Sequence, residues 1–544
     1  MFFQPRLLSS FKGYNRALLT KDLFAGLTVG VVALPLAMAF AIASGLKPEA
    51  GIFTAIIAGG LISLLGGSRV QIGGPAGAFI VIVYGIVDRY GVANLLIATA
   101  MSGVFLFAMG VFRLGTLVRF IPIAVIIGFT NGIAFLIGLS QMKDFFGLAI
   151  PKMPADFFSS IQALYLAADT VNFMAVAIAV ASLGILILWR RYQNQLGWLK
   201  HLPGTVIAMV LATMSTAIFD LPVDTIGSRF GGIPAGLPHF EWLSISWSTA
   251  QFVIMPALTL AILGAIESLL CARVADGMIH DRHEPNQELM AQGIANFVSP
   301  FFGGMPATGT IARTVTNVQS GGSTPLSGIV HALTLLLVIL FAAPLAKHVP
   351  LASLAAILMF VAWNMGEWAK FFDLKQFRLA YRLTMLTVFA LTIILDLTVA
   401  VQVGLLLAFI TFIYRISSLS RCEAALAADF PALQNQAGRI DAYRIYGAIF
   451  FGAVRLLEAI EKNLPSDTLL LDLKNVIYID ASGMDTILEL KHLCDSAQVK
   501  LIICGLAHQP YDVAKRSGLL ETLGPDCQYP DLAVGIQAAT HSST

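Results

Sequence analysis

Charged residues are scarce in this sequence. Of its 544 residues, 12% are Asp, Glu, Lys or Arg, and 57% are hydrophobic. A water-soluble domain carries roughly 25% charge. A chain this apolar does not cover itself with polar surface in water, so we expect a lipid bilayer to surround most of its length. The formal net charge of +2 gives no basis for binding nucleic acid.

Cysteine is scarce as well, and the five cysteines form no CxxC pair. This pattern excludes a disulfide framework and a zinc site, so we expect free thiols, no metal and no cofactor. The HDRHE string at 280–284 lacks zinc-protease spacing and is predicted to be a solvated loop. The sequence contains no Walker or GxGxxG string, so we do not expect nucleotide hydrolysis to drive transport. It also contains no evident nucleophile–base pair, so we do not expect an enzyme.

Long apolar runs fill the first 414 residues. This region holds 23 Lys+Arg and 17 Asp+Glu, whereas the last 130 residues hold 11 and 15, a higher density of charge. We therefore predict an α-helical polytopic membrane protein with a small soluble domain at its C-terminal end. Several apolar runs are shorter than the roughly 20 residues that a straight spanning helix needs. The fourteen predicted spans are 24–43, 51–66, 74–88, 94–112, 119–140, 171–189, 203–219, 252–272, 288–302, 307–318, 326–346, 351–364, 381–395 and 398–414.

The basic residues predict the orientation. The N-terminal segment and the even-numbered connections carry 16 Lys+Arg, and the odd-numbered connections carry 6. Cytoplasmic connections are enriched in Lys and Arg. Residues 1–23 lack the pattern of a cleaved signal peptide. We therefore expect a multi-pass protein of the inner membrane with both termini in the cytoplasm.

The predicted organisation has four parts. They are a cytoplasmic N-terminal segment (1–23), a membrane domain (24–414), a linker (415–437) and a C-terminal domain (438–544). In the C-terminal domain, alternating and β-branched runs predict strands and periodic runs predict helices, which together indicate a mixed sheet with helices. The predicted strands are Ile440–Phe451, Thr468–Leu473, Val476–Ile479 and Lys500–Gly505, and the predicted helices are Val454–Asn463 and Ser482–Ser496.

Two short spans begin with similar Gly- and Pro-rich strings, GGPAGA from Gly73 and GGMPATGT from Gly303. They start the third and tenth spans, which are seven spans apart, as an inverted repeat requires. Gly and Pro interrupt helices. The freed backbone groups must then line a cavity or lie buried in protein. Two half-helix N-termini that meet in the membrane form an anion site. The alternative is that the small residues only permit close helix packing.

Two ionisable residues within spans are further candidates. Glu267 lies deep in the apolar string LTLAILGAIESLLC, and Arg313 lies in the short tenth span. Charged groups are costly at this depth and usually functional. Arg313 could face an anion, or its long stem could carry its charge to the membrane surface.

With these features, the sequence resembles the SulP family, the bacterial relatives of animal solute-carrier family 26, over essentially the whole chain. The matching strings include GGSRVQIGGPAGAF, GAIESLLCARVADGM and NQELMAQGIANFVSPFFGGMPATGTIARTVTNVQSGG. The likeness is strongest to the DauA-type branch of dicarboxylate transporters. The resemblance implies a uracil-permease-like fold of seven plus seven inverted spans, with spans 1–4 and 8–11 in a core domain and the others in a gate domain.

The resemblance also implies a substrate site between the starts of spans 3 and 10, against spans 1 and 8. Glu267 matches a position linked in the family to proton or sodium coupling. Many sulfate-transporting members carry Gln after the proline of span 1, but Leu36 follows Pro35 here, which weakens a claim for sulfate. The implied substrate-binding residues are Leu36, Phe40, Gly74, Pro75, Ala76, Gly77, Ser268, Thr308, Gly309, Thr310 and Arg313.

The C-terminal stretch LLLDLKNVIYIDASGMDTILEL resembles the STAS domain. Ser482 is predicted to cap the helix that follows it. In related antagonist proteins a serine of this loop is phosphorylated, so a regulatory role for Asp480 and Ser482 is a weaker alternative. The loop is also a candidate surface for a cytoplasmic protein partner, and the family commonly forms homodimers.

We therefore expect secondary active transport of a small anion by alternating access. The first expectation is symport of a C4-dicarboxylate such as succinate or fumarate with a proton that Glu267 carries. Fold likeness alone does not define a substrate. The alternatives are sulfate or bicarbonate transport, coupling to sodium, and an anion channel or exchanger.

Overall fold

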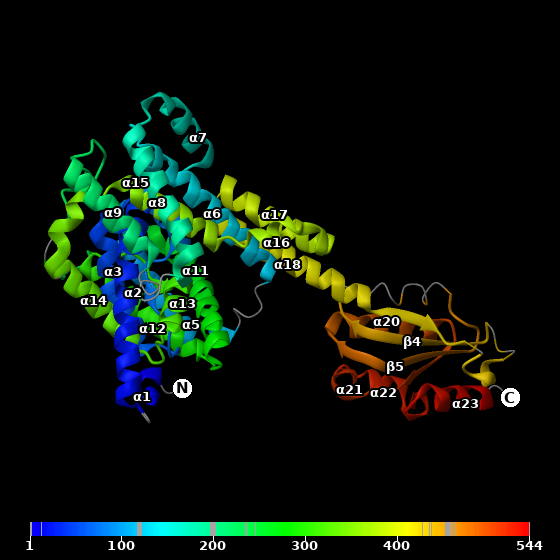
Figure 1. Cartoon of the computed structure of the whole chain (residues 1–544). Helices are drawn as coiled ribbons and strands as arrows, with labels where there is room; N and C mark the ends of the chain where they lie inside the picture. Colours follow the sequence, from blue (N-terminus) through cyan, green and yellow to red (C-terminus); the bar gives the residue numbers. More distant parts are fainter. Residues whose placement is uncertain are drawn as a thin grey trace. The chain divides into compact units, whose positions relative to one another are not determined.

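The computed structural model divides the chain into two compact units, Met1–Leu405 and Leu406–Thr544 (Figure 1). The first unit holds nearly all of the apolar segments, and the second holds the predicted sheet. The structure describes residues 3–542 with the exception of 12–13, 117–121, 196–202, 234–235, 237, 245, 396, 427, 435, 437, 452–456, 458–459 and 461–462.

Helices occupy all fourteen ranges that the sequence predicts as spans. In lipid, a helix bonds its own backbone groups, which is why apolar runs take this form. Within the described chain, eight helices are long and apolar enough to cross a bilayer. The start of the range 119–140 lies outside the described residues. The segments are α2 (Arg16–Ala43), α3 (Pro48–Leu65), α4 (Ile80–Tyr90), α5 (Val92–Val111), α6 (Ile123–Phe146), α8 (Phe173–Tyr192), α9 (Gly204–Phe219), α11 (Trp247–Ile279), α12 (Pro285–Val298), α13 (Ile311–Gln319), α14 (Leu326–Ala342), α15 (Leu351–Met365), α17 (Leu379–Ile394) and α18 (Leu397–Leu419).

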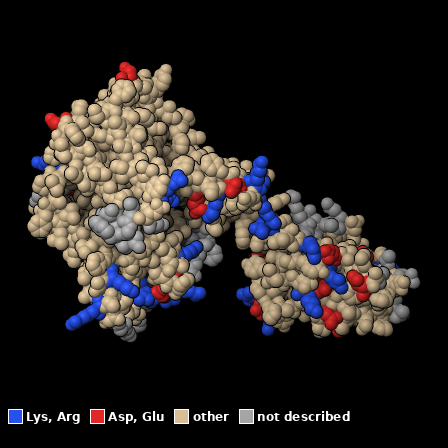
Figure 2. All heavy atoms as spheres, viewed as in Figure 1, with Lys and Arg blue, Asp and Glu red and all other residues tan. Residues whose placement is uncertain are grey.

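Large apolar side chains cover the outside of the first unit. Phe173 is 84% exposed and Phe341 is 81% exposed. So much apolar surface is unfavourable in water but suits contact with lipid tails. Figure 2 shows mostly uncharged atoms on the visible face of this unit, and Lys and Arg gather at the end where α1 (Arg6–Ser10) lies in Figure 1. The unit is therefore a multi-pass membrane domain.

The helices of the membrane unit pack in two groups. In the first group, α2, α3, α5, α11, α12 and α14 contact one another. A Cβ added at Gly103 of α5 would lie 2.4 Å from the backbone nitrogen of Phe297, so the backbones of α5 and α12 nearly touch. In the second group, α6 contacts α8, α15 and α17. The two groups match the predicted core and gate domains. The inverted repeat of seven plus seven spans stays a prediction.

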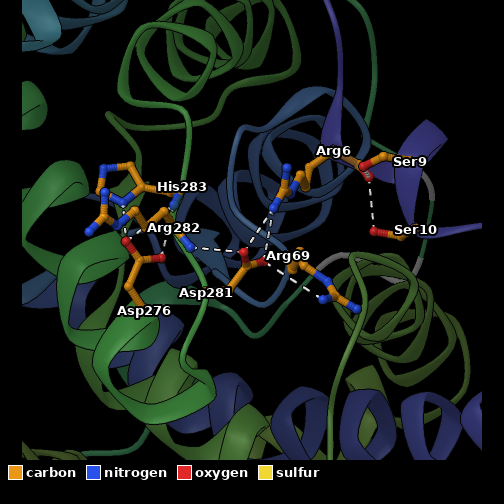
Figure 3. Close-up of polar contacts among 8 residues, drawn as sticks. All are labelled: Arg6, Ser9, Ser10, Arg69, Asp276, Asp281, Arg282 and His283. Atoms are coloured by element: carbon orange, nitrogen blue, oxygen red, sulfur yellow. Dashed lines mark hydrogen bonds and ion pairs between the residues drawn. The ribbon is translucent and has the colours of Figure 1, made fainter.

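The loop at 280–284, which the sequence predicts to be solvated, forms ion pairs with other parts of the membrane unit. The Asp281 carboxylate accepts hydrogen bonds from Arg6 Nη2 at 2.9 and 3.0 Å, and Arg69 lies 3.7 Å away (Figure 3). His283 Nδ1 pairs with Asp276 at 2.7 Å. Although partial burial opposes it, the hydrogen bonds from the Arg282 N–H and from Arg6, with the nearby positive charges, hold the pKa of Asp281 below its ordinary value. The loop thus fastens the N-terminal segment to the membrane unit.

The second unit is built on a five-stranded sheet in the order β3-β4-β5-β6-β7. The sheet is parallel except for β3, which pairs antiparallel with β4. Helix α20 (Ala481–Ser496) packs against one face and α23 (Leu532–Ser542) against the other, which makes β5 apolar on both faces. The strands are β3 (Arg421–Ala424), β4 (Ile440–Ile449), β5 (Thr468–Ile479), β6 (Lys500–Cys504) and β7 (Gln528–Tyr529).

Several details of this unit differ from the sequence predictions. The two strands predicted at Thr468–Leu473 and Val476–Ile479 are one strand, β5, because the polar residues between them, Lys474 and Asn475, stay in extended backbone at its exposed part. The range predicted as a linker, 415–437, contains the end of α18 and β3. Most of the helix predicted at Val454–Asn463 lies outside the described residues.

The cysteines of this unit are free. Burial raises the pKa of the Cys504 thiol to about 12 and that of the Cys494 thiol to about 11. A reactive cysteine needs a lowered pKa and access to solvent. These two thiols therefore act as small apolar groups in the core.

The cap of α20 is Asp480 and not Ser482. Asp480 Oδ1 accepts a hydrogen bond from the Gly483 N–H at 2.8 Å, and Oδ2 accepts one from the Phe451 N–H at 3.3 Å. Ser482 lies in the first turn of the helix and is exposed. The prediction that Ser482 caps the helix was therefore wrong, because the carboxylate two residues earlier reaches the free amide first.

Replacing Asp480 with Ala should destabilise α20 by about 1 kcal/mol, because the first-turn amide loses its acceptor. Hydrogen exchange on the full-length protein would measure this as faster exchange in the first turn of α20. Ser482→Ala is the matched control and should leave exchange nearly unchanged. Equal effects of the two substitutions would contradict the assignment of the cap.

Candidate functional site

The two Gly- and Pro-rich strings cross inside the first group of helices. Strand β1 (Gly73–Gly74) pairs antiparallel with β2 (Thr308–Gly309). After β1 the chain passes through a short 3-10 turn (Gly77–Phe79) into α4, and after β2 it enters α13. All four strand residues are buried. The short third and tenth spans are therefore strand–helix hybrids whose helical N-termini start next to the crossing.

Helix α2 borders this crossing on one side. Leu36 and Phe40 lie one turn apart on α2, and they are 4% and 5% exposed. A Cβ at Gly77 would lie 3.6 Å from Phe40 Cε1, an ordinary van der Waals contact. Pro75 and Ala76 are buried between β1 and this turn. Phe40 of span 1 and Gly77 of span 3 are thus close together, and Leu36 lies one helical turn from Phe40.

Helix α11 borders the crossing on another side. Thr308 Oγ1 donates to the Gly264 carbonyl at 3.1 Å, and Ser268 Oγ accepts from Gln71 Nε2 at 2.8 Å. Thr310 donates from its N–H and its hydroxyl to the Ile72 carbonyl, at 2.9 and 3.0 Å. The predicted polar residues of spans 8 and 10 are therefore brought together, and each of these hydroxyls holds the crossing in place.

Glu267 has a different setting from its neighbour Ser268. Its side chain is half-buried, and no hydrogen bond or ion pair joins it to another residue in the described part of the chain. It lies on α11 between Gly264 and Cys271, whose thiol donates to Thr314 Oγ1 of α13 at 3.2 Å. An acidic group without a partner inside a membrane domain is a candidate for binding a proton or a cation.

Arg313 is the central finding at the crossing. Its side chain is 1% exposed, and Nε, Nη1 and Nη2 have no hydrogen-bond partner. A Cβ added at Gly74 would lie 2.4 Å from Arg313 Nη1, so the guanidinium lies directly against the backbone of β1. The alternative that Arg313 extends to the membrane surface is excluded by this burial. A buried charge without a partner is highly unfavourable, so the free donors of Arg313 make it a candidate for binding an anion.

The residues that hold the crossing together are not among those predicted from the sequence. Glu288 of α12 is fully buried and accepts hydrogen bonds from the Gly67 N–H at 2.8 Å, the Ser68 N–H at 3.0 Å and Gln71 Nε2 at 3.0 Å. The sequence feature that could have indicated Glu288 is its position at the start of a predicted apolar span, where acidic residues are rare.

The segment before β2 is fixed in the same way. Asn296 of α12 bonds Ala307 on both sides, accepting from its N–H at 2.7 Å and donating to its carbonyl at 2.8 Å. Thr54 Oγ1 of α3 accepts from the Met305 N–H at 2.7 Å. Backbone groups that leave the helix are thus satisfied by side chains.

His331 of α14 is a second missed residue. It is fully buried, and neither ring nitrogen has a hydrogen-bond partner. A Cβ added at Gly59 of α3 would lie 2.8 Å from the Gly73 carbonyl oxygen and 3.6 Å from His331 Cε1, which places the ring near β1. A histidine within the apolar run GIVHALTLLL was the available signal.

The crossing therefore collects positive charge. Each helix start contributes a partial charge of roughly +0.5, and Arg313 contributes a full charge without a paired carboxylate. Among the described residues, no group of three or more His, Cys, Asp or Glu side chains could hold a metal ion. Two interrupted spans that cross inside a multi-pass membrane unit, followed by a small mixed-sheet domain, define the class of membrane protein to which this chain belongs.

The sequence profile of the Sulfate permease family matches residues 19–388, and that of the STAS domain matches residues 434–530. The chain belongs to the Sulfate permease family. It is a transporter of anions and not an enzyme.

Relatives agree with this assignment. "Putative sulfate transporter YvdB" of Bacillus subtilis (strain 168) is 42% identical over 526 residues, covering 95% of this chain and 97% of the relative. Bicarbonate transporter BicA of Picosynechococcus sp. (strain ATCC 27264 / PCC 7002 / PR-6) is 32% identical over 531 residues, covering 93% and 92%. The structure of murine Slc26a9 matches with a TM-score of 0.86 at 18% identity over 99% of this chain and 94% of the other, which supports the fold alone. The resemblance to DauA-type dicarboxylate transporters finds no support among these names.

Replacing Gly74 with Ala should raise the KM for the transported anion about tenfold. The new methyl group would lie 2.4 Å from Arg313 Nη1, which is closer than van der Waals contact, so the guanidinium must move away. Gly85→Ala in α4 is the matched control, since a Cβ there meets nothing within 4 Å. Uptake into liposomes would be measured for both variants. An unchanged KM for Gly74→Ala would contradict the placement of Arg313.

Proposed function

We propose that the chain carries a small inorganic oxyanion, sulfate or bicarbonate, through the membrane by alternating access. The unpartnered guanidinium of Arg313 at the crossing of β1 and β2 is the observation that carries this proposal. An oxyanion bound there would accept hydrogen bonds from the guanidinium and supply the missing negative charge. The names of the relatives include both sulfate and bicarbonate transporters.

A C4-dicarboxylate is the less favoured substrate. It carries two carboxylates at the ends of a carbon chain, and each buried carboxylate needs its own donors. Arg313 is the only cation that the described residues place at the crossing. Leu36 and Phe40, on the bordering helix, are apolar. A compact oxyanion concentrates its charge within reach of one guanidinium, which suits this site better.

The test is uptake by the purified protein in liposomes. Labelled sulfate and bicarbonate should enter with saturable kinetics and show counterflow, and excess succinate should compete weakly. Preference for succinate would overturn the substrate class, and unsaturable flux would indicate a channel instead of a carrier.

Arg313→Gln should raise the KM for the transported anion by at least about tenfold, since a charged hydrogen-bond partner is lost from a buried site. Arg16→Gln removes the same charge from an exposed position at the start of α2 and serves as the control. Uptake by Arg313→Gln with wild-type KM would contradict the proposed site.

We further propose that Glu267 couples transport to an ion gradient, with a proton as the first choice. A half-buried carboxylate with no cationic partner is stabilised by taking up a proton. Sodium is the alternative, because the Glu267 carboxylate, the Thr308 hydroxyl and the Gly264 carbonyl lie on neighbouring parts of α11 and β2, and hard cations prefer oxygen ligands.

Glu267→Gln should abolish the stimulation of uptake by a pH gradient while anion exchange continues, since glutamine cannot take up the proton. Uptake would be measured with a pH gradient, with a sodium gradient and with neither. Glu284→Gln, at an exposed position of the 280–284 loop, is the control. Full pH coupling in Glu267→Gln would exclude this role, and stimulation of the wild type by sodium alone would favour the sodium alternative.

The orientation and assembly belong to the same proposal. We place α1 and the STAS domain on the cytoplasmic side of a bacterial inner membrane, because basic residues concentrate in the N-terminal segment and the connections on its side. Homodimer formation and a protein partner at the loop of Asp480 and Ser482 stay predictions from the family resemblance.

A further inference from the structure

A cavity of about 420 Å³ lies between the two groups of helices in the membrane unit. Helices α2 and α4 of the first group form one wall, through Ile42, Ile80 and Tyr84. Helix α6 and the connection at 151–157 form the other wall. The two groups are joined here by an ion pair of 2.6 Å between Lys152 and Asp88.

This cavity lies at the end of the membrane unit opposite the N-terminal segment. Helix α2 begins at Arg16 and ends at Ala43, a rise of about 42 Å at 1.5 Å per residue. Gly45 and Leu46, which line the cavity, follow the far end of α2. Figure 1 accordingly shows α1 and α7 (Phe157–Leu166), whose Ser160 lines the cavity, at opposite ends of the membrane unit.

Two of the elements that line the cavity also border the crossing. Ile42 lies two residues beyond Phe40 on α2, and Ile80 directly follows the turn at Gly77–Phe79. Phe40 and Gly77 are the residues that border the crossing from this side. The cavity and the crossing therefore share two bordering elements, helix α2 and the start of α4.

The charges that line the cavity do not balance. Asp88 pairs with Lys152, and Asp144 pairs with Arg229 at 2.6 Å. Lys143 is left over. Its Nζ donates to the Pro151 carbonyl at 3.2 Å, and among the described residues no carboxylate forms an ion pair with it.

Lys143 is also buried, with 7% of its surface exposed. An ammonium group has three donors, and the structure gives this one a single acceptor. The carboxylates of Asp144 and Asp224 are close enough to act on this charge, but neither forms an ion pair with it. The two remaining donors of the ammonium group favour a negatively charged ligand in the cavity.

We infer that this cavity is an outer docking site, where Lys143 holds the oxyanion before it moves to Arg313. The inference rests on the proposed function and adds a second binding step on the face opposite α1. The cavity is much larger than one inorganic oxyanion, so the anion enters with part of its water shell. Separation of Lys152 from Asp88, as the two groups of helices move, would then open the path inward.

The test compares the two faces of the membrane. In liposomes with one orientation of the protein, Lys143→Met should raise the KM about tenfold for anion supplied on the cavity side, because a charged hydrogen-bond partner is lost. The KM for anion supplied on the side of α1 should stay unchanged. Lys143→Arg should retain most of the affinity. Lys47→Met removes an exposed charge from the same face outside this cavity and should change neither KM.

A second pair of variants keeps Lys143 in place. Ser140 lines the cavity one turn before Lys143 on α6, so Ser140→Asp should neutralise the ammonium and raise the same one-sided KM, whereas Ser140→Asn should not. This pair decides the question if Lys143→Met fails to fold. Equal KM changes on both sides, or none in either pair, would overturn the docking site while saturable oxyanion uptake by the wild type leaves the proposed function standing. Absence of oxyanion uptake by the wild type would instead overturn the proposed function.

Discussion

The membrane unit depends on how it satisfies the backbone where two spans are interrupted. In an apolar medium, each free N–H or carbonyl group costs several kcal/mol. Here β1 and β2 pair with each other, and side chains of α12 and α3 bond the flanking amides. This arrangement lets two helices start in the middle of the protein. Without it, neither the concentration of positive charge nor the burial of Arg313 would be stable.

The same requirement explains why some polar residues hold the crossing together while others are left without a partner. Thr308, Thr310 and Ser268 bond within the protein and hold the crossing together. Arg313 lacks such bonds, and Glu267 makes none to the residues the structure describes. At the crossing, the hydroxyl groups are thus satisfied by the protein itself, whereas the donors of Arg313 are left free.

Sequence reasoning found the features that are local. The GGPAGA and GGMPATGT strings indicated the broken spans, and charge within apolar runs indicated Glu267 and Arg313. It missed Glu288, Asn296 and their amide partners, because those contacts join residues far apart in the chain. The same reason explains the cap of α20, where Asp480 also accepts from the distant Phe451 amide. Strand β3 was missed because its pairing with β4 crosses a stretch with no strong pattern.

The balance of charge at the crossing links the choice of anion to the membrane voltage. On the proposed roles, the charges of an ionised Glu267 and of Arg313 sum to zero in the empty carrier, although the two side chains form no ion pair. Adding one proton and one bicarbonate leaves that balance at zero, so this loaded carrier would move without work against the electric field. Adding one proton and one sulfate leaves one negative charge, for which a full crossing exchanges about 2.3 kcal/mol per 100 mV. With one fixed cation and one acid that takes up a proton, the dependence of transport on the membrane voltage thus follows the valence of the substrate.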